Sequence, residues 1–519
     1  MDKDLISVQE ARDVARLAAA AQKEFAKFSQ TQVDAIVKAM ADAGFEAAER
    51  LAKLAYEETR MGRYEDKIVK NQFGTRDVYD YIKDMKTVGV IRHDEKKKIY
   101  EIGWPMGVVA AIIPTTNPTS TVMYKILISL KAGNGVAVAP HPRAAKCTFE
   151  AAEILRKAAE KHGAPKGLVG CIQTPTIEGT QALMQCPEIA VILATGGHGI
   201  VHAAYSSGKP AYGVGSGNAP AFIEKTANVK KAVADIVAGK CFDYGLLCSS
   251  ENSMIVDISL KEQALAELKN NRAHLCSDDE KTKLEKLMFG RGRLNTEIIG
   301  MPASVIAEKA GFSVPANTTI LVAPCKEVGK QEPLSAEKLS PVLSLFYVDG
   351  WEAGCDLAVK ILNFGGIGHT MSIHSNDHDV IMRFGLEKPA FRICVNTVST
   401  LGAVGYTTGL APSMTLGPGT LGGSITTDNI MPTHLINVKR LAFEIRPFRS
   451  TLVNQTAASP NESSGADAKY EQPAFDSRPK KQKSEMRIPS GSGERTYGSS
   501  ALKETEIDRI VDEFIKSRK

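Results

Sequence analysis

Hydrophobic and polar positions change their spacing near residue 105, and this change predicts two kinds of structure in the first half of the chain. Before it, apolar residues recur at helical spacing, from a capping box of Ser7 and Glu10 toward Phe28 and again from about Thr31 to Thr59. After it, short runs rich in valine and isoleucine alternate with stretches of helical spacing. We therefore expect a helical first part, followed by strands and helices in alternation.

The apolar runs after residue 105 predict strands that are buried on both faces. Runs of this kind, each followed by a helix, are typical of a parallel sheet covered by helices, which binds ligands at the carboxyl ends of its strands. The predicted strands are Gly107–Pro114, Gly135–Pro140, Gly167–Gln173 and Ile189–Ala194, and the predicted helices are Ser120–Ala132, Arg143–His162 and Ile177–Gln185. The second half alternates less regularly, through 252–258, 320–324, 342–348 and 391–395, and predicts a second α/β domain.

The composition changes sharply near Arg446. From Ser450 to about Ser499 the chain is rich in Ser, Asn, Gly, Pro and Lys and nearly devoid of aliphatic residues, which predicts a flexible linker. In the segment after it, residues 507, 510, 511, 514 and 515 are apolar and share one helical face. We expect an amphipathic helix that binds a groove on another protein. A helix that docks back on its own domain is the alternative, but such docking would not need this tether.

Composition and charge narrow the class of protein. The 519 residues, 43% hydrophobic and 24% charged, have room for two or three globular domains. The net charge of +5 is small for this length, and no basic stripe with interleaved aromatic residues predicts a nucleic-acid site. No apolar run reaches the roughly 18 residues of a membrane helix, and the polar N-terminus does not resemble a secretory signal. We expect a cytoplasmic protein that binds neither nucleic acid nor membrane.

The nine cysteines are spread singly along the chain, without a CxxC pair or a Cys/His cluster at zinc spacing. No metal site is therefore predicted, and most of these cysteines are expected to be buried hydrophobic residues.

Two glycine-rich stretches could contact a nucleotide. In the first, a predicted strand runs into Thr195, Gly196 and Gly197 and then a helix, whose free N–H groups would favour an anion. A tight turn without a ligand explains the same glycines. The second, Tyr212-GVGSGNAP, has the spacing GxGxG and no convincing helix after it, so it is a weak dinucleotide fingerprint.

Four local patterns occur in one order: Pro114-TTNPTS, Tyr212-GVGSGNAP, Phe242-DYGLLCSSENS and Glu337-KLSPVLSLF. At these separations they resemble the aldehyde dehydrogenase superfamily, and each is closer in form to its CoA-acylating branch, as is Leu410-APSMTLGPGTLGGS. The resemblance covers roughly residues 5–446. It implies an oxidoreductase with NAD as cofactor and coenzyme A as co-substrate, built as a homodimer or homotetramer.

The resemblance also implies the catalytic residues. Cys248 matches the nucleophile, whose thiolate adds to the aldehyde carbon so that a hydride can leave. Asn117 matches the asparagine whose amide, with the backbone N–H of the cysteine, forms the oxyanion hole. A turn residue before Pro118 is the alternative for Asn117, and a buried structural cysteine is the alternative for Cys248. Cys241 stands outside the motif position and should be dispensable.

Contacts to the cofactor are implied at several further positions. They are Glu337 at the nicotinamide ribose, Thr195, Gly196 and Gly197 beside the dinucleotide, His141 and Arg143 where hydrolytic relatives carry a lysine motif for the adenosine ribose, and Pro114 and Thr115 in the motif of Asn117.

The most informative feature of the resemblance is a missing carboxylate. Hydrolytic members place a water-activating glutamate where this chain has Gly213, and no acid replaces it nearby in the sequence. Without that base, hydrolysis of a thioester should be slow, whereas a thiol such as coenzyme A can attack directly. We therefore expect acyl-CoA formation from acetaldehyde or propionaldehyde. The alternatives are a hydrolytic aldehyde dehydrogenase, a reductase of acyl phosphates, and a non-catalytic scaffold.

By this resemblance the fold is α/β, with a Rossmann-like cofactor domain, a catalytic domain and strand arms. The expected parts are an NAD-binding domain at 1–220 with an arm at about 92–106, a catalytic domain at 221–405, a return to the cofactor domain with a second arm at 406–446, a linker at 447–499 and a helix at 500–519. The tail resembles encapsulation peptides of bacterial microcompartments, whose shells confine volatile aldehydes. Shell or cargo proteins are therefore expected partners.

Overall fold

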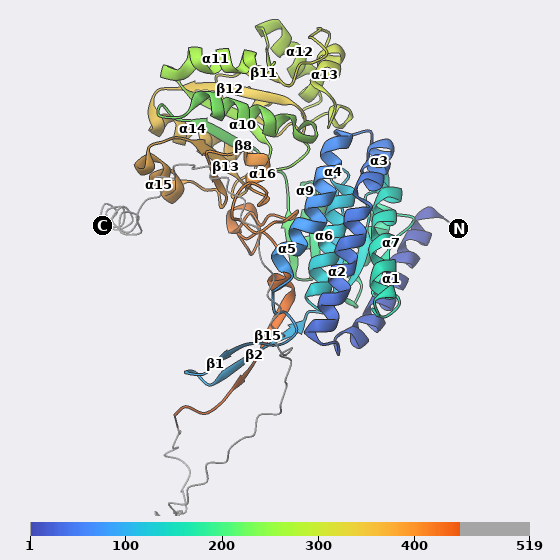
Figure 1. Cartoon of the computed structure of the whole chain (residues 1–519). Helices are drawn as coiled ribbons and strands as arrows, with labels where there is room; N and C mark the ends of the chain where they lie inside the picture. The colour runs from blue at the N-terminus through green and yellow to red at the C-terminus, as the bar shows by residue number, and fades with distance from the viewer. Residues whose placement is uncertain (1, 447–519) are drawn as a thin grey trace, which may run out of the picture. The chain divides into compact units, whose positions relative to one another are not determined.

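The structure is a computed structural model that describes residues 2–446. The predicted linker at 447–499 and the predicted helix at 500–519 lie outside the described residues. The residues up to Phe443 form one unit that contains three β-sheets (Figure 1). Within the described part, no helix combines the length and the apolar character needed to cross a bilayer.

The first part of the chain is helical, as its spacing predicts. It forms α1 (Lys3–Phe25), α2 (Gln30–Glu46), α3 (Ala48–Thr59), α4 (Tyr64–Gln72) and, after a π-helical turn at Phe73–Asp77, α5 (Val78–Ile82). Ser29 and Gln32 form a capping box at the start of α2.

The predicted capping box of Ser7 and Glu10 is wrong. Asp2 caps α1, and Ser7 is buried inside that helix. The Ser7 hydroxyl accepts the N–H of Thr176 at 3.1 Å, and the Glu10 carboxylate accepts the N–H of Gln173 at 2.9 Å. Both side chains therefore accept hydrogen bonds from backbone N–H groups of a loop that precedes another helix. They do not cap their own helix, because the distant backbone offers better partners.

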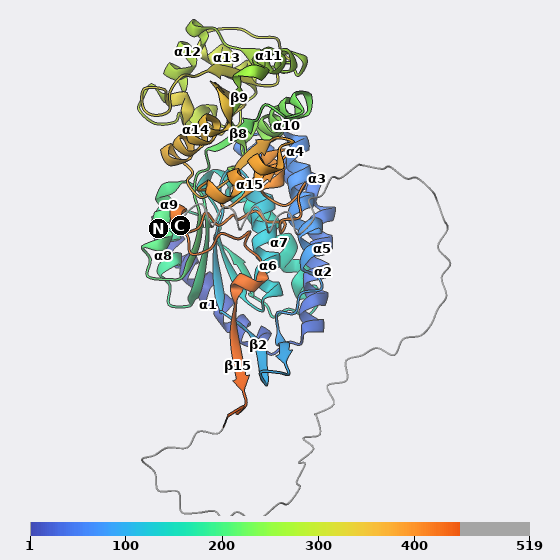
Figure 2. The ribbon, with the colours of Figure 1, turned by 90° about the vertical axis from the view of Figure 1, so that its left-hand side faces the viewer.

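A five-stranded parallel sheet follows, in the order β5-β4-β3-β6-β7. All four predicted strands and all three predicted helices between them are present. Helices α1, α8 and α9 cover one face, and α6 and α7 cover the other (Figure 2). The elements are β3 (Val108–Ile112), α6 (Pro118–Lys131), β4 (Gly135–Ala139), α7 (Ala145–Lys161), β5 (Val169–Cys171), α8 (Ile177–Gln185), β6 (Ile189–Thr195), α9 (His198–Tyr205) and β7 (Ala211–Val214).

A seven-stranded parallel sheet occupies the second half, in the order β10-β11-β12-β9-β8-β13-β14. Its strands are β8 (Ala219–Ile223), β9 (Glu251–Asp257), β10 (His274–Leu275), β11 (Leu321–Pro324), β12 (Val342–Val348), β13 (Met371–His374) and β14 (Ile393–Val395). Its helices are α10 (Val229–Cys241), α11 (Lys261–Asn270), α12 (Asp278–Phe289), α13 (Ala303–Ala310), α14 (Gly350–Phe364), α15 (His378–Glu387) and α16 (Ser399–Gly402).

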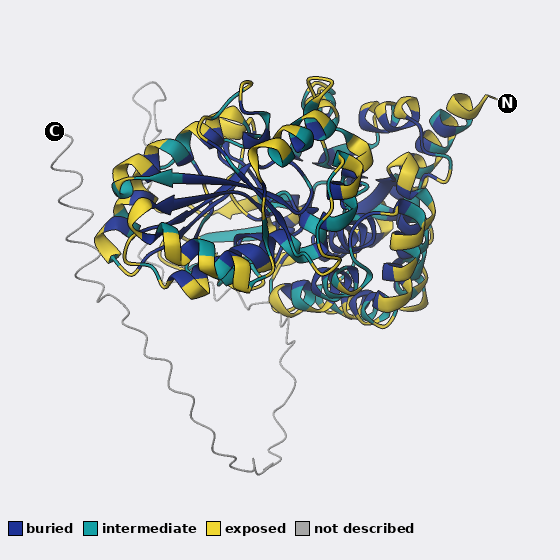
Figure 3. Ribbon diagram, turned by 90° about the horizontal axis from the view of Figure 1, so that it is seen from above, coloured by how far each residue is buried: buried dark blue, intermediate teal, exposed yellow. Residues whose placement is uncertain are grey.

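The strands of this sheet are apolar on both faces because each face has its own core. Phe222 and Ile255 belong to one hydrophobic cluster, whereas their neighbours Ala221 and Met254 belong to the cluster on the other face. Figure 3 shows buried strands between helices whose outer faces are exposed. The predicted α/β fold class is confirmed.

The third sheet is antiparallel and comprises β1 (Gly89–Asp94), β2 (Ile99–Pro105) and β15 (Ile436–Ala442). Its side chains stay half-exposed: Trp104 is 51% exposed, and the Lys439 ammonium lies 3.4 Å from the centre of its ring. Strands β2 and β15 fall within the two predicted arms, whereas β1 begins three residues before the first of them. Their role in oligomerisation, like the division into functional domains, stays a prediction.

The segment between α16 and β15 returns to the five-stranded sheet. The buried Tyr124 hydroxyl on α6 lies 2.8 Å from the Ser413 hydroxyl and donates to the Ile430 carbonyl. The Asn134 amide donates to the Leu435 carbonyl at 2.9 Å. These bonds attach the return segment to the core beneath α6.

We predict that Tyr124→Phe destabilises the protein by about 1–3 kcal/mol, because it leaves the buried Ile430 carbonyl without its donor. Thermal unfolding of the two proteins should show a lower midpoint for the variant. Tyr81→Phe is the control, since this tyrosine is 46% exposed. Equal midpoints for wild type and Tyr124→Phe would contradict the assigned role of this hydroxyl.

Candidate active site

The predicted cofactor residues gather at the carboxyl edge of the five-stranded sheet. Thr195 ends β6, Gly196 and Gly197 follow it, and His141 comes shortly after the end of β4. Pro114 and Thr115 follow β3, and Arg143 stands two residues after His141. Because β3 pairs in parallel with both β4 and β6, these segments lie at one edge. The chain order reverses between β3 and β6, which is where open α/β sheets bind ligands.

The glycine turn after β6 leaves the start of α9 open. Gly197 is the N-cap residue of α9, and a Cβ built on it meets no described atom within 4 Å. A Cβ on Gly196 would instead lie 2.6 Å from the Ile200 side chain. The turn therefore requires glycine for packing at one position and leaves room for a ligand at the next. The free N–H groups at the start of α9 suit the pyrophosphate of a dinucleotide.

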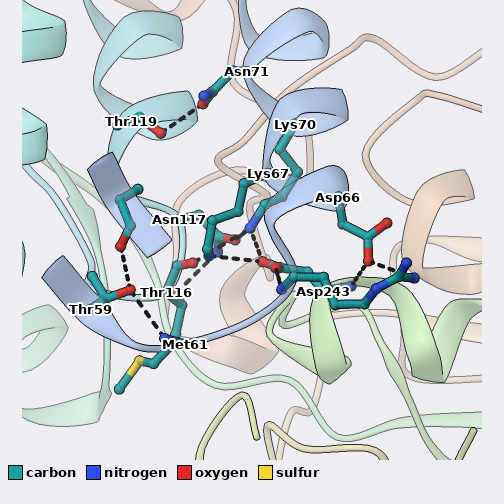
Figure 4. A network of polar contacts seen from close by, with 12 residues as sticks. Thr59, Met61, Asp66, Lys67, Lys70, Asn71, Thr116, Asn117, Thr119 and Asp243 are labelled. Atoms are coloured by element: carbon teal, nitrogen blue, oxygen red, sulfur yellow. Dashed lines mark hydrogen bonds and ion pairs between the residues drawn. The ribbon is translucent and has the colours of Figure 1, made fainter. Parts of the chain in front are cut away.

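Asn117 lies at the start of α6, directly after the predicted cofactor loop. Its side chain turns away from its own helix: the amide oxygen accepts a hydrogen bond from the Lys70 ammonium at 2.6 Å, and the amide nitrogen donates to the Thr116 hydroxyl at 3.0 Å (Figure 4). A simple turn residue would use its side chain on the nearby backbone. The contact with Lys70 makes that alternative the weaker one.

Cys248 lies in the loop between a short 3-10 turn at Phe242–Gly245 and strand β9. The thiol is half-buried and packs against the core cluster that contains Leu247 and Met414. Burial, together with the charge of Glu337, raises the pKa of Cys248 to about 12, although the charge of Arg392 opposes this shift. The thiol is therefore protonated near neutral pH, and attack by its sulfur needs a base.

The segment Tyr212-GVGSGNAP forms the crossing from β7 to β8, so it is a connection between the two parallel sheets. A Cβ on Gly217 would lie 2.1 Å from the Cys248 carbonyl oxygen and 3.1 Å from Nδ1 of His369. The Gly217 N–H donates to the Glu337 carboxylate at 2.9 Å. Glycine at this position thus allows the crossing to pass between Cys248, His369 and Glu337.

The sequence indicated no acid near the Gly213 motif, but in the fold one carboxylate does act on Cys248. It belongs to Glu337, whose charge raises the pKa of the thiol. Burial raises the pKa of Glu337 itself to about 7, although the Gly217 N–H opposes this shift. Glu337 is thus partly protonated at neutral pH.

At Gly213 the structure leaves no space for a side chain. A Cβ there would lie 2.6 Å from the Val201 side chain and 2.7 Å from the Tyr205 hydroxyl. That hydroxyl accepts the Gly213 N–H at 3.0 Å and donates to the Gly213 carbonyl at 3.1 Å. Helix α9 therefore fills the place in which hydrolytic relatives carry their glutamate.

Sequence reasoning missed two buried residues beside Cys248. Burial lowers the pKa of His369 to about 3, so its ring is neutral, and its Nε2 has no hydrogen-bond partner within residues 2–446. Arg392 donates to the His369 carbonyl at 2.8 Å and to the Asn429 side chain at 2.7 Å. It also donates to the carbonyls of Gly417 and Thr427. Neither residue belongs to a motif, and only the fold brings them to Cys248.

A small apolar cavity lies beside this loop. Leu247, which precedes Cys248, and Lys70, which holds Asn117, both line it. The other lining residues are Val69, Phe73, Phe242, Leu401, Val404, Tyr406 and Met414. The lining is almost entirely apolar, and the cavity itself is no larger than about one water molecule.

Among residues 2–446 there is one group of potential metal ligands, although the sequence predicted none. The ligand atoms of His274, Cys276 and Glu280 lie within 4.8 Å of one another at the β10 edge of the seven-stranded sheet. Glu280 already accepts from the Ser277 N–H at 2.8 Å and pairs with His274 at 3.1 Å. A helix cap and an ion pair account for this geometry.

We predict that Glu337→Gln speeds alkylation of Cys248 by iodoacetamide about three- to tenfold at pH 9. The thiolate is the reactive form, and loss of the neighbouring negative charge lowers the pKa of the thiol. The difference should shrink below pH 7, because wild-type Glu337 is then largely protonated. Mass spectrometry of the Cys248 peptide gives the rates. The distant variant Glu308→Gln should match wild type, and a Glu337→Gln rate no higher than wild type would contradict the contact.

Comparison with known proteins places this geometry in a family. Residues 4–287 match the aldehyde dehydrogenase family. The bifunctional aldehyde-alcohol dehydrogenase of Escherichia coli is 44% identical over 427 residues, which cover 81% of this chain and 48% of that protein. The chain thus spans about half the length of the aldehyde-alcohol dehydrogenases among its curated relatives.

Two solved structures share the fold over almost their whole length. An acetylating aldehyde dehydrogenase from Geobacillus thermoglucosidasius has a TM-score of 0.85 and 51% identity, covering 86% of this chain and 99% of that one. A propionaldehyde dehydrogenase from the fucose utilisation microcompartment of Clostridium phytofermentans has a TM-score of 0.75 and 26% identity, covering 84% and 97%. With a family match over more than half of its residues, this chain belongs to the aldehyde dehydrogenase family.

Proposed function

We propose that this protein is a CoA-acylating aldehyde dehydrogenase that oxidises a short aldehyde with NAD⁺ through a thioester on Cys248. The observation that carries the proposal is the site around the thiol. A half-buried cysteine lies beside a neutral histidine, and Tyr205 fills the place of the water-activating glutamate. The acetylating enzyme from Geobacillus thermoglucosidasius, at 51% identity, supports the same activity.

In the first step the Cys248 sulfur attacks the aldehyde carbon, and the carbonyl oxygen becomes an alkoxide. Asn117 and the backbone N–H of Cys248 would donate hydrogen bonds to that oxygen. Such donors typically contribute about 10²–10³ in rate each, because they stabilise charge only as it develops. Collapse of this alkoxide would release a hydride from the carbon of the adduct and leave a thioester on Cys248.

Attack requires that the thiol lose its proton, since burial raises the pKa of Cys248 to about 12. Glu337 is the base that we favour, because burial raises its pKa to about 7, close to neutral pH, and its charge acts on the thiol. His369 is the weaker candidate, since its pKa of about 3 makes it a poor proton acceptor and its Nδ1 already lies 2.9 Å from the Thr370 hydroxyl. Coenzyme A brings a second thiol that must lose a proton, and the same base serves both steps. Acyl transfer then frees Cys248 for the next turnover.

NAD⁺ fits the carboxyl edge of the five-stranded sheet, where the open start of α9 would hold its pyrophosphate. NAD⁺ supplies the hydride acceptor. The residues that we propose around it are Thr195, Gly196, Gly197, His141, Arg143, Pro114, Thr115 and Glu337. On this basis 1–220 is the cofactor domain and 221–405 the catalytic domain, with 406–446 returning to the cofactor domain.

A hydrolytic aldehyde dehydrogenase is the second candidate, and Glu337 favours it. A carboxylate with a pKa of about 7 that influences Cys248 could activate water. We prefer coenzyme A as acyl acceptor because Glu337 is held by the Gly217 N–H and because α9 closes the Gly213 position. Dependence of turnover on coenzyme A separates the two functions.

We propose acetaldehyde or propionaldehyde as the substrate. The cavity between Leu247 and Lys70 has an apolar lining, which favours an aldehyde with an apolar chain over one with a charged chain. One structural neighbour at 26% identity is a propionaldehyde dehydrogenase.

We further propose that the enzyme works inside a bacterial microcompartment in the cytoplasm. That propionaldehyde dehydrogenase belongs to a fucose utilisation microcompartment, and the sequence of residues 500–519 has the apolar spacing of an encapsulation peptide. The half-exposed strands β1, β2 and β15 would join subunits of a homodimer or homotetramer.

We predict that Cys248→Ser lowers NADH formation by at least about 10³-fold, because a hydroxyl is a far weaker nucleophile than a thiolate. Cys241→Ser should keep activity within about twofold of wild type. Spectrophotometry at 340 nm with C1–C6 aldehydes, with and without coenzyme A, gives both results. Wild type should show one NADH per site without coenzyme A and steady turnover with it.

Other outcomes of this assay identify other functions. Steady NADH formation that ignores coenzyme A indicates the hydrolytic enzyme, and dependence on phosphate with NADP⁺ indicates a reductase of acyl phosphates. Unchanged activity in Cys248→Ser would falsify the proposed nucleophile. Wild type that forms no NADH with any aldehyde points to the scaffold.

A separate prediction concerns the C-terminal residues 501–519. Deletion of residues 501–519 should leave NADH formation unchanged while the protein no longer co-purifies with microcompartment shells. Co-expression with shell proteins and sedimentation of the shells measures this. Lost activity or lowered thermal stability in the truncated protein would favour docking on its own domain instead.

A further inference from the structure

We propose that Lys70, held by the buried carboxylate of Asp243, is a positioning residue that orients the Asn117 amide for the oxyanion of the aldehyde. The inference rests on the proposed function and extends it to residues outside the sequence motifs. It is carried by a buried network of polar side chains on helix α4, on the loop after α10, and at the start of α6 (Figure 4).

Asp243 is the centre of the network. Its carboxylate is completely buried and accepts hydrogen bonds from the Arg63 N–H at 2.8 Å, from the Lys67 ammonium at 3.3 Å and from the Lys70 ammonium. The Asp243 N–H donates in turn to the Asp66 carboxylate at 2.8 Å. The carboxylate and helix α4 thus fix each other over a long separation in sequence.

Lys70 connects this cluster to Asn117. Its ammonium donates to the Asn117 amide oxygen at 2.6 Å. An ammonium carries only donors, so it can pair with the oxygen of the amide and never with its NH₂ group. The contact therefore decides which way round the Asn117 amide sits.

The orientation of this amide determines whether it helps or hinders the reaction. With its oxygen on Lys70, Asn117 has two amide hydrogens to donate; the Thr116 hydroxyl takes one, and one remains for a ligand. A flipped amide would present its oxygen to the developing alkoxide and repel it. The cationic donor also polarises the amide and strengthens its remaining N–H as a donor.

Neutralising Asp243 does not by itself require Lys70, because Lys67 already pairs with the same carboxylate. A second buried ammonium is costly, and burial lowers the pKa of Lys70 to about 8. The Asp66 carboxylate and the Lys67 ammonium also act on Lys70, in opposite directions. Two contacts distinguish Lys70 from Lys67: the short one with the Asn117 amide oxygen and a longer one, at 3.5 Å, with the Thr116 carbonyl.

The test compares Lys70→Met with its matched control Lys67→Met. Each variant removes one ammonium, keeps an apolar stem of similar length and leaves Asp243 one lysine partner. We measure the rate of the NADH burst with saturating aldehyde, the KM for aldehyde, NAD⁺ binding by fluorescence, and thermal unfolding. The same measurements on Asn117→Ala and on Asn117→Ala/Lys70→Met complete a double-mutant cycle.

We expect Lys70→Met to lower the burst rate about 100-fold with NAD⁺ affinity unchanged, and Lys67→Met to stay within about threefold of wild type. In the Asn117→Ala background, Lys70→Met should cost less than threefold more, because the amide that it orients is gone. Should Lys70→Met not fold, Lys70→Gln takes its place with the same expectations.

The proposal is overturned if Lys70→Met and Lys67→Met lose activity equally, or if the effects of Asn117→Ala and Lys70→Met multiply. Either result would mean that Lys70 only stabilises the fold around the site and does not orient the Asn117 amide. If the wild-type protein gives no NADH burst, the proposed function is refuted instead. Failure of the proposed function is therefore distinguishable from failure of the role of Lys70.

Discussion

The buried carboxylate of Asp243 joins the two parts of the site. Three donors satisfy it, two of them lysine ammoniums of helix α4, and the backbone that carries it is left-handed at Asp243 and at Tyr244. Such strain in residues other than glycine costs about 1–3 kcal/mol each and persists only where the surroundings enforce it. Loss of one partner of a buried ion pair costs about 3–5 kcal/mol. The loop that leads to Cys248 is thereby locked to the helix that reaches Asn117.

Close approach of backbone to backbone is the second constraint on this site. The crossing from β7 to β8 runs so near the Cys248 carbonyl that no side chain fits at Gly217, and the N–H of that residue holds Glu337. From the other side, Arg392 ties the His369 carbonyl to the return segment through Gly417 and Asn429. Several distant segments therefore hold polar and charged groups in fixed positions around the thiol. Catalysis by a preorganised site requires such an arrangement.

The local pattern of apolar residues was enough to predict the strands and the sheet edge at which we expect the cofactor. Runs that are apolar on both faces predict parallel strands, and loops after such strands meet at one edge, so Thr195 and His141 could be placed from sequence. Pattern failed wherever a distant partner decided the outcome. Ser7 has the spacing of a helix cap but bonds to Thr176, and nothing local links Lys70 to Asp243, 173 residues away. His369 and Arg392 were missed for the same reason, since single polar residues carry no periodic signal.

The packing at Gly213 also bears on how enzymes of this kind could change their chemistry. A glutamate introduced there would meet the side chains of Val201 and Tyr205, so these side chains would have to shift before a carboxylate at this position could activate water. Both side chains belong to helix α9, which begins at the glycine turn where we propose that the dinucleotide binds. Under the proposed function, the same eight helical residues therefore border the site of the electron acceptor and the position that decides the acyl acceptor. A change from thioester-forming to acid-forming descendants would then involve the neighbours Val201 and Tyr205 as well as position 213 itself.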